Sequence, residues 1–340
     1  IIDSSNICEL GLEAYRPRLL KREIAKDFTK NFKMDDLETN KIIVSLSGGV
    51  DSMVLSYILI KLYGSSNVIA VHINYNNRKE CENEVEIIKQ WTSFLEIPLY
   101  VRKIQELSRP ECMELELRDL YESFTRDLRY MTYINTAKLV GSRKCIVYLG
   151  HNRDDCFENI LTNIAYKNKY DNLNGIDLNM TIDNINFYRP IIDIPKADIY
   201  KYAINHNLPY LKNSTPDWCQ RGKIRTSVVP VLEQWDNRII DGLFNITEIL
   251  KDLHINLYLN VKEMKKTNII DINSLNTSIL FWKYGIFNLF NFYPSNKSLN
   301  CLIERLKIFK IIGIITLIKN IFFKVCLSSL FIQTIYPIYL

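Results

Sequence analysis

Two short clusters of glycine, hydroxyl and carboxylate side chains carry the chemistry that this sequence suggests. SGGVDS, at residues 47–52, and GHNRDDCFEN, at residues 150–159, each stand between an apolar run and a helical pattern. Glycines at such a turn let a bound group approach the backbone, and the first amides of the following helix have no partner within it. The first cluster therefore predicts a phosphate-binding turn.

The side chains of the first cluster fit this prediction. Ser47 and Ser52 add hydroxyl groups, and Asp51 adds a carboxylate that can hold Mg²⁺ between phosphate oxygens. A plain glycine turn capped by Ser47 is the structural alternative. We assign these residues to phosphate binding: Ser47, Gly48, Gly49, Val50, Asp51 and Ser52.

The elements that must position these clusters alternate between strand and helix. Hydrophobic periodicity predicts strands at residues 42–46, 67–73, 98–104, 145–149 and 187–194, and helices at residues 53–59, 80–94, 114–139 and 197–206. This alternation indicates βαβ units and a parallel sheet. Ligands of such sheets bind outside the carboxyl ends of the strands, which is where both clusters fall.

SGGVDS after a buried strand resembles the signature of the PP-loop ATP pyrophosphatases, which split ATP between its α and β phosphates. The Walker loop and the dinucleotide fingerprint do not fit, because the required lysine and the third glycine are missing. The resemblance implies an α/β fold with a doubly wound, mainly parallel sheet of the adenine nucleotide alpha hydrolase-like type. A helical region and a small C-terminal domain would follow it.

Three further segments resemble the tRNA(Ile)-lysidine synthase family. GHNRDDCFEN is similar to the family's GHxxDDxxET, and TRDLRY, at residues 125–130, is similar to its ARxxRY helix. The third segment, within residues 208–232, keeps at family spacing Ser214, Asp217, Arg221, Ile224, Arg225, Pro230 and Leu232. The chain departs from the family at Cys156, Asn159, Pro216 and Gly222, and keeps only Gly175 and Ile176 of a glycine-rich stretch.

The resemblance implies a site with a nucleotide end and a nucleophile end. His72, Gly150 and His151 are the further candidates for the nucleotide, although a packed core histidine also explains His72. The candidates for catalysis, besides Asp51, are Asp154, Asp155, Glu158 and Arg129. The candidates for RNA binding are Arg126, Lys212, Arg221, Lys223 and Arg225. Carboxylates at a helix start and arginines on a solvated helix face are the structural alternatives.

The resemblance also implies a reaction, the ligation of lysine to C2 of the wobble cytidine of tRNA(Ile) with a CAU anticodon. The C2 oxygen would attack the α-phosphorus of ATP, and pyrophosphate would leave. The lysine amine would then attack C2, and AMP would leave. The expected cofactors are ATP and Mg²⁺, and the expected partners are tRNA(Ile) and free L-lysine, with no membrane.

Two other functions remain open. One is thiolation of a tRNA base by a related PP-loop enzyme, against which the lack of a CxxC pair counts. The other is nucleotide-dependent RNA binding without catalysis, which the departures from the family pattern would explain. An amidotransferase would need a glutaminase partner or domain, and the sequence shows no N-terminal cysteine domain of that kind.

Length and composition suggest two domains. The chain has 340 residues, 47% of them hydrophobic, and a formal net charge of +5, which is ordinary for a globular protein. We expect a basic N-terminal extension at residues 1–36, an ATP-binding catalytic domain at 37–233, and a helical linker with a tRNA-contacting domain at 234–340. Residues 310–340 are apolar, but Lys319 and Lys324 would lie near the middle of a membrane span, so we expect buried strands or a helix.

The cysteines indicate neither a zinc site nor a sulfur relay. The chain has 8 cysteines, and no two of them form a CxxC pair. Because no signal peptide stands at the start, we expect free thiols in a reducing, cytoplasmic compartment. The sequence begins with Ile1, so we expect a few leading residues to be missing. The oligomeric state is left open, with a homodimer as one option.

Overall fold

The structure of the chain is a computed structural model. It describes residues 24, 26–32, 41–77, 79–140, 145–166, 175–211, 220–267, 269–271, 279–290, 294–308, 313–318, 321–326 and 329–334. The chain forms two compact units, Ile1–Gly242 and Leu243–Leu340. Both sequence clusters belong to the first unit.

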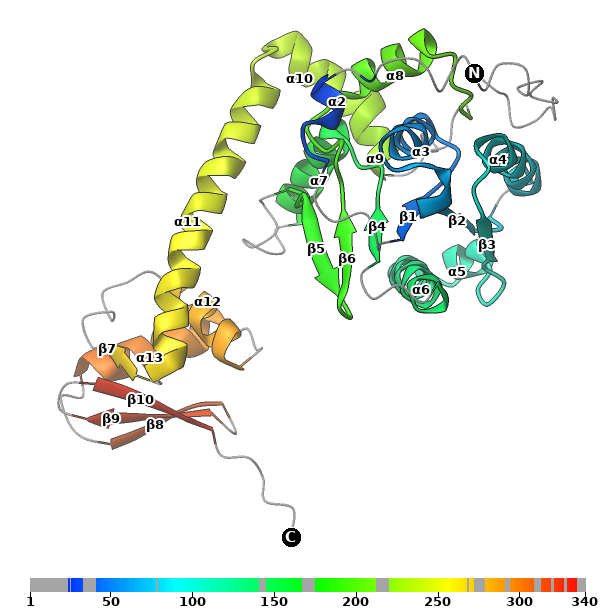
Figure 1. The fold of residues 1–340 in the computed structure, drawn as a ribbon. Helices are drawn as coiled ribbons and strands as arrows, with labels where there is room; N and C mark the ends of the chain where they lie inside the picture. The colour runs from blue at the N-terminus through cyan, green and yellow to red at the C-terminus, as the bar shows by residue number, and fades with distance from the viewer. Residues whose placement is uncertain are drawn as a thin grey trace. The chain divides into compact units, whose positions relative to one another are not determined.

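A six-stranded sheet organises the first unit (Figure 1). Its strands are β1 (Ile42–Ser45), β2 (Val68–Asn74), β3 (Leu99–Lys103), β4 (Ile146–Tyr148), β5 (Asn179–Ile182) and β6 (Ile185–Tyr188), in the spatial order β3-β2-β1-β4-β6-β5. All neighbouring strands are parallel except β5 and β6, which form an antiparallel hairpin. The strand order reverses at β1, so the carboxyl ends of β1 and β4 flank the crevice where such sheets bind ligands.

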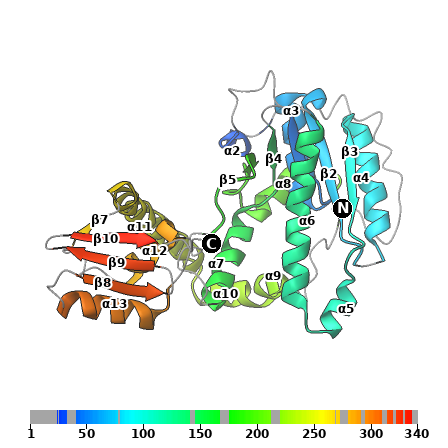
Figure 2. The same cartoon turned by 90° about the horizontal axis from the view of Figure 1, so that it is seen from below.

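Helices cover both faces of this sheet, as Figures 1 and 2 show. They are α3 (Val50–Tyr63), α4 (Cys81–Leu95), α5 (Arg109–Glu114), α6 (Arg118–Leu139), α7 (Arg153–Tyr166) and α8 (Lys196–Asn205), with a short 3-10 helix at Ser65–Asn67. Buried residues of α3, α4 and α8 pack with Ile42 and Val44 on one face of β1. Residues of α6 pack with Ile43 on the other face. The sheet is therefore doubly wound and mainly parallel, as the sequence predicts.

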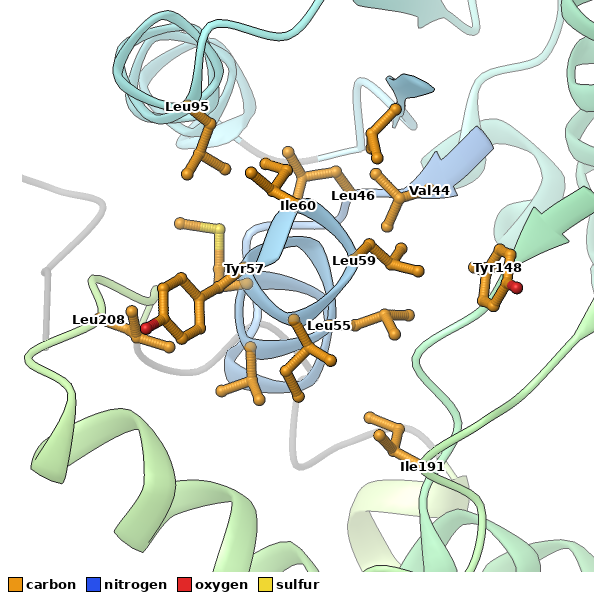
Figure 3. Packing of buried hydrophobic residues seen from close by; sticks show 14 of the residues in the cluster. Val44, Leu46, Leu55, Tyr57, Leu59, Ile60, Leu95, Tyr148, Ile191 and Leu208 are labelled. Carbon is orange, nitrogen blue, oxygen red and sulfur yellow. The ribbon is translucent and has the colours of Figure 1, made fainter. Parts of the chain in front are cut away.

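Helix α3, which follows the glycine turn, is apolar all round its circumference. Leu55, Tyr57 and Leu59 are each 0% exposed, and Figure 3 shows side chains of several other elements surrounding the helix. A helix that is apolar on every side is stable only when it is buried on every side. The glycine turn is therefore held between two fully packed elements, β1 and α3.

Two predicted elements have different bounds in the structure. The helix predicted at residues 114–139 begins later in the structure, as α6 at Arg118, and Glu114 is instead the last residue of α5. Glu116, between the two helices, has a positive φ of 58°, which interrupts the helical backbone. The strand predicted at residues 187–194 ends at Tyr188. Pro190 has no backbone N–H for a sheet, and turn hydrogen bonds follow, from Ile192 N to Arg189 O at 3.2 Å and from Ile194 N to Ile191 O at 3.1 Å.

Part of the basic N-terminal extension packs on the first unit. Helix α2 (Lys26–Thr29) buries Phe28, and Phe32 beyond it is also buried in the core beside α3. The Tyr188 hydroxyl donates to Asn31 O at 2.6 Å. Most of the extension's other residues lie outside the described ranges.

After α8, helix α9 (Gln220–Lys223), a π-helical segment (Ile224–Val228) and helix α10 (Val229–Trp235) complete the first unit, and α11 (Ile239–Thr267) begins in it. The second unit contains α12 (Ile279–Phe290), α13 (Asn296–Ile308) and an antiparallel sheet of β7 (Ile269–Asp271), β8 (Gly313–Ile318), β9 (Ile321–Cys326) and β10 (Ser329–Thr334). The described part of residues 310–340 thus forms strands. None of the described helices is both long and apolar enough to span a membrane.

Candidate active site

The turn between β1 and α3 is closed by its own serines. Ser52 Oγ accepts a hydrogen bond from Ser47 N at 3.1 Å and donates to Gly49 O at 3.0 Å. Gly48 has a φ of +84°, and a Cβ at this position would lie 2.4 Å from Leu211 Cδ1. Gly49 is the residue before α3, so the first amides of the helix face the end of β1. The local geometry therefore suits a phosphate group.

The second cluster lies directly beside the first because β4 pairs with β1. A Cβ at Gly150 would lie 3.2 Å from Ser52 N and 3.3 Å from the carbonyl carbon of Asp51. Asn152 and Asp155 form a reciprocal cap of α7, in which each side chain accepts from the other's backbone N–H, at 3.0 and 3.1 Å. The amide of Asn152 also donates to Asp51 Oδ1 at 2.9 Å. Asn152 thus joins the starts of α3 and α7.

Asp51 lies between an amide and an ammonium group. Its Oδ2 forms an ion pair with Lys196 Nζ, while its Oδ1 accepts from Asn152. Burial raises the pKa of Asp51 above its ordinary value, Lys196 lowers it, and the negative charge of Asp155 raises it further. Two carboxylates and one ammonium therefore act on one another at the carboxyl ends of β1 and β4.

Two arginines bind the carboxylates of α7. Arg221 donates from Nη2 to Asp155 Oδ1 at 2.9 Å and from Nε to Glu158 Oε2 at 3.0 Å. Arg225, in the π-helical segment, donates to Glu158 Oε1 from Nε at 2.9 Å and from Nη2 at 2.6 Å. Glu158 is only 2% exposed, and burial raises its pKa although both arginines lower it. Glu158 therefore anchors both guanidinium groups from behind.

Two histidines beside these groups are neutral. His72 is buried, and its Nδ1 lies 2.8 Å from Leu46 O, so Nδ1 carries the proton. His151 accepts from Arg189 Nε at 3.2 Å through Nδ1, which leaves Nε2 as the protonated nitrogen. Burial lowers the pKa of both groups, that of His151 to about 3.

Several of these side chains line one cavity of about 490 Å³. The sequence-predicted residues that line it are Ser47, Gly49, Asp51, Ser52, His72, Arg129, Gly150, His151, Asp155, Arg221 and Arg225. Of the other predicted residues, Gly48, Val50, Arg126, Asp154, Glu158 and Lys223 are described but are not part of the lining. Lys212 lies outside the described residues.

The predicted residues outside the lining make contacts elsewhere in the first unit. Asp154 is exposed, and its Oδ2 accepts from the backbone N of Lys196 at 2.8 Å. Arg126 is exposed on α6 and contacts Ser123 and Asp127. Glu158 lies behind the two arginines. Neither Asp154 nor Glu158 therefore borders the cavity, although sequence analysis predicts both as catalytic residues.

Sequence reasoning did not assign several residues that the structure brings to the cavity. Lys196, Tyr133 and Glu84 line it, and Asn152 holds Asp51. The Tyr133 hydroxyl lies 2.6 Å from Ser45 Oγ, and burial raises the pKa of Tyr133 to about 12. Two sequence features could have identified residues of this cavity. Glu84 is a carboxylate on the apolar side of α4, and Lys196 is a cation just after a parallel strand and its turn.

Replacing Gly48 by Ala is expected to destabilise the first unit by about 1–3 kcal/mol, because the residue has a positive φ and Leu211 occupies the space of the Cβ. Gly242→Ala is the matched control. It lies inside α11 with nothing within 4 Å of the added Cβ, so it should be stabilising by about 0.5 kcal/mol. Urea denaturation measures both. Equal midpoints for Gly48→Ala and the unsubstituted protein would contradict the strained turn.

The neutral histidines predict a loss of stability in acid. In the unfolded chain both regain a pKa of about 6.5, so below that pH the unfolded state binds protons that the folded state does not. The free energy of unfolding should then fall by up to about 1.4 kcal/mol per pH unit for each histidine as the pH decreases from 6.5. Denaturation at several pH values measures this slope. His151→Gln should make it shallower, and an unchanged slope would show that His151 is not held neutral.

The fold and the cavity define a class of protein. A doubly wound sheet with a strand, glycine turn and helix at the switch point, and charged groups beside it, is typical of α/β proteins that bind nucleotide phosphates. Residues 20–232 match the sequence family described as the PP-loop domain. Since this match covers more than half of the 340 residues, the chain belongs to the PP-loop family.

The chain is also similar to individual relatives in this family. It is 26% identical over 232 residues to the tRNA(Ile)-lysidine synthase of Lactobacillus gasseri, covering 66% of this chain and 51% of that protein. It is 32% identical over 213 residues to the tRNA(Ile)-lysidine synthase of Clostridium tetani, covering 61% of this chain and 43% of that one. The chain thus spans about half the length of the curated relatives it matches.

Among solved structures, the chain is similar to a U34-tRNA thiolase from Methanococcus maripaludis that contains a 4Fe-4S cluster. The TM-score is 0.53 and the identity 19%, over 70% of this chain and 80% of that one. At this identity the similarity shows a shared fold of the adenine nucleotide alpha hydrolase type, and it does not show a shared substrate.

Proposed function

We propose that the chain is a tRNA(Ile)-lysidine synthase, which uses ATP to join lysine to C2 of the wobble cytidine of a tRNA(Ile) with a CAU anticodon. The observation that carries the proposal is one cavity that is lined both by the phosphate turn and by Asp155 with Arg221. The names of relatives such as those in Lactobacillus gasseri and Clostridium tetani support it.

In the proposed first step, the amides from Gly49 to Ser52 bind phosphate oxygens of ATP, as the start of a helix does. The α-phosphorus then faces the cytidine. The C2 oxygen of the base forms a bond to this phosphorus, and the bond to the β-phosphate oxygen breaks. Pyrophosphate leaves with the electron pair of that bond, so cations around the turn accelerate the step by stabilising the developing charge.

The residues at the turn fit a magnesium ion. Asp51 and Asp155 both line the cavity, and the negative charge of Asp155 raises the pKa of Asp51, so a divalent cation would relieve their repulsion. No group of three or more His, Cys, Asp or Glu side chains among the described residues could hold a metal ion. The carboxylate of Asp51, completed by phosphate oxygens and water, is however sufficient for Mg²⁺. When bound, the ion would neutralise phosphate charge.

In the proposed second step, the lysine amine attacks C2 of the adenylated base, and AMP leaves. Asp155 is the carboxylate of α7 that lines the cavity, so we assign to it the recognition of the amine and the uptake of its proton. Glu158 and Asp154 hold the charged groups that surround the reaction. Arg129, which lies 5.5 Å from the centre of the Tyr130 ring, is a further cation at the cavity wall.

The RNA approaches this cavity in the proposal along basic residues. Arg221 and Arg225 line it, and Lys223 is exposed between them on the same segment of chain. Basic side chains bind the phosphates around a splayed single-stranded base, and the base itself enters the pocket. Arg126 and Lys212 remain proposed contacts of the same RNA, and the second unit is the proposed holder of the rest of the tRNA.

Labelled lysine provides the direct test of this function. The protein is incubated with ATP, Mg²⁺, labelled lysine and tRNA(Ile) transcripts bearing a CAU or a GAU anticodon. We expect label to enter the CAU transcript alone, with one pyrophosphate released for each lysine. Pyrophosphate release without incorporated lysine would indicate another nucleophile, such as the sulfur of a thiolating enzyme. RNA binding without either signal would indicate a binding protein that has lost catalysis.

A further inference from the structure

Lys196 lines the cavity, and the proposed reaction assigns it no role. It is the first residue of α8 and follows the turn after β6. Its side chain is only 18% exposed and forms an ion pair with Asp51, whose side chain is 17% exposed. Asp51 is the second residue of α3, so the ammonium group lies beside the amides that are proposed to bind phosphate.

The other cations of the cavity wall have different surroundings. Arg221 and Arg225 bind the carboxylates of α7, and Arg129 lies against tyrosines of α6 and the loop after β2. Among the described residues, Lys196 is the cation that forms an ion pair with a residue of the phosphate turn. A lysine ammonium has three N–H donors. It can therefore hold Asp51 and donate to phosphate oxygens at the same time.

A purely structural role does not account well for this ion pair. Removing two charges from water costs several kcal/mol, so a buried pair is weak evidence that it exists for stability. The apolar contacts of α8 with α3, through residues such as Ile199 and Tyr202, already attach this helix to the core. The ion pair instead borders the cavity, where a charge can act on a ligand.

Two hydrogen bonds fix the place of Lys196. The carboxylate of Asp154 accepts from the backbone N of Lys196 at 2.8 Å, and the backbone N of Arg153 donates to Ile194 O at 3.1 Å. The start of α8 is thereby attached to the start of α7. The exposed carboxylate of Asp154 is thus connected to the cavity through the backbone that carries Lys196.

We propose that Lys196 is a catalytic residue that binds the β- and γ-phosphates of ATP and stabilises the departing pyrophosphate, and that Asp154 is its positioning residue. The proposal deepens the proposed function and rests on it for the identity of the nucleotide. As the bond between the α-phosphorus and the bridging oxygen breaks, the electron pair goes to pyrophosphate, and the ammonium group bears the added negative charge without transferring a proton. AMP lacks these two phosphates, so Lys196 should distinguish ATP from AMP.

Calorimetric titration of the full chain with ATP and with AMP, both in Mg²⁺, tests the proposal. Lys196→Met should weaken ATP binding by about 10- to 100-fold, the size of a lost charge-assisted contact, and AMP binding by less than about 3-fold. Lys196→Arg should retain most of the preference for ATP. The matched control is Lys201→Met on the same helix, where the lysine is 73% exposed and pairs with Asp198. It should leave both affinities unchanged.

A second variant guards against a loss of folding. If Lys196→Met lowers the melting temperature, Lys196→Gln is used in its place, because the glutamine amide can still donate to Asp51 but carries no charge.

The positioning role of Asp154 has its own test. Asp154→Ala should reduce the ratio of ATP to AMP affinity by about 5-fold, as expected for the loss of one hydrogen bond. Asp154→Asn retains an acceptor oxygen and should restore the ratio. A structural role alone would change stability and leave the ratio constant.

The outcomes separate this proposal from the proposed function. Equal ATP to AMP ratios in the Lys196 variants and the unsubstituted protein would overturn the assignment of Lys196, even if lysine enters tRNA. A lost ATP preference in these variants would support the assignment, even if no lysine enters tRNA. An unsubstituted protein that binds ATP no better than AMP would overturn it as well.

Discussion

Asp51→Asn should lower the rate of pyrophosphate release by about 10³-fold, which corresponds to about 4 kcal/mol of transition-state stabilisation. The substitution removes the negative charge that holds Lys196 and that fits a magnesium ion beside the phosphates. The side chain keeps its shape and its oxygen for the hydrogen bond from Asn152. Single-turnover release of labelled pyrophosphate from ATP, with the CAU transcript present, measures the effect.

The fold should survive this substitution. Burial already raises the pKa of Asp51, so the folded protein opposes its charge, and a neutral side chain removes that cost while leaving Lys196 with a weaker partner. Asp198→Asn is the matched control, because Asp198 is a half-exposed carboxylate of α8 whose partner is Lys201. Normal turnover of Asp51→Asn in a folded protein would exclude a role of this carboxylate at the phosphate turn.

Glu158→Gln should reduce lysine incorporation by about 10²-fold while pyrophosphate release falls much less, because the arginines beside Asp155 lose the carboxylate that orients them. We also expect about 2 kcal/mol of lost stability, at the low end for a broken buried ion pair, since the arginines are 46% and 38% exposed. Separate assays of labelled lysine, labelled pyrophosphate and urea denaturation measure the three effects.

Glu122→Gln provides the comparison for this second variant. Glu122 also pairs with an arginine, Arg118, but both side chains are about half exposed on α6. Exposed pairs contribute about 0–1 kcal/mol, so neither stability nor incorporation should change measurably. If Glu158→Gln behaves like Glu122→Gln, the two arginines do not depend on Glu158, and its proposed positioning role is wrong.

The local pattern of the sequence predicted most elements of the first unit. The β-branched run at Ile42, Ile43 and Val44 forms a strand buried on both faces, and the apolar helix after Gly49 is surrounded by core residues. Both predictions follow from the types of side chain found within a single strand or helix. The predictions failed where a single backbone feature interrupts a pattern, as Glu116 does between α5 and α6 and Pro190 does after β6.

The hairpin of β5 and β6 shows a second reason for missed structure. Residues of β5 alternate between half-buried and exposed, and their short run has little apolar content of its own. Pairing with β6 decides that this segment is a strand. Because β-propensity depends strongly on neighbouring strands, the sequence of such an edge strand carries a weak signal.

The carboxylates of α7 show the same limit at the site. Asp154, Asp155 and Glu158 have similar positions in the sequence pattern, and the pattern gives no reason to separate them. In the structure Asp155 lines the cavity, Glu158 is buried behind two arginines, and Asp154 accepts from the start of α8. These different surroundings arise from α8 and from the segment around Arg221, which lie far along the chain.

The sequence by itself determined the phosphate turn, because SGGVDS brings its glycines, hydroxyls and carboxylate together within a few bonds. It also determined the class of fold, because the alternation of buried strands and helices is local. Only the tertiary structure decided the composition of the cavity. The pairing of β1 with β4 brings Asn152 to Asp51, and the turn after β6 brings Lys196 to the same carboxylate. Contacts between residues so distant in sequence depend on sheet order and turn geometry, which no single segment encodes.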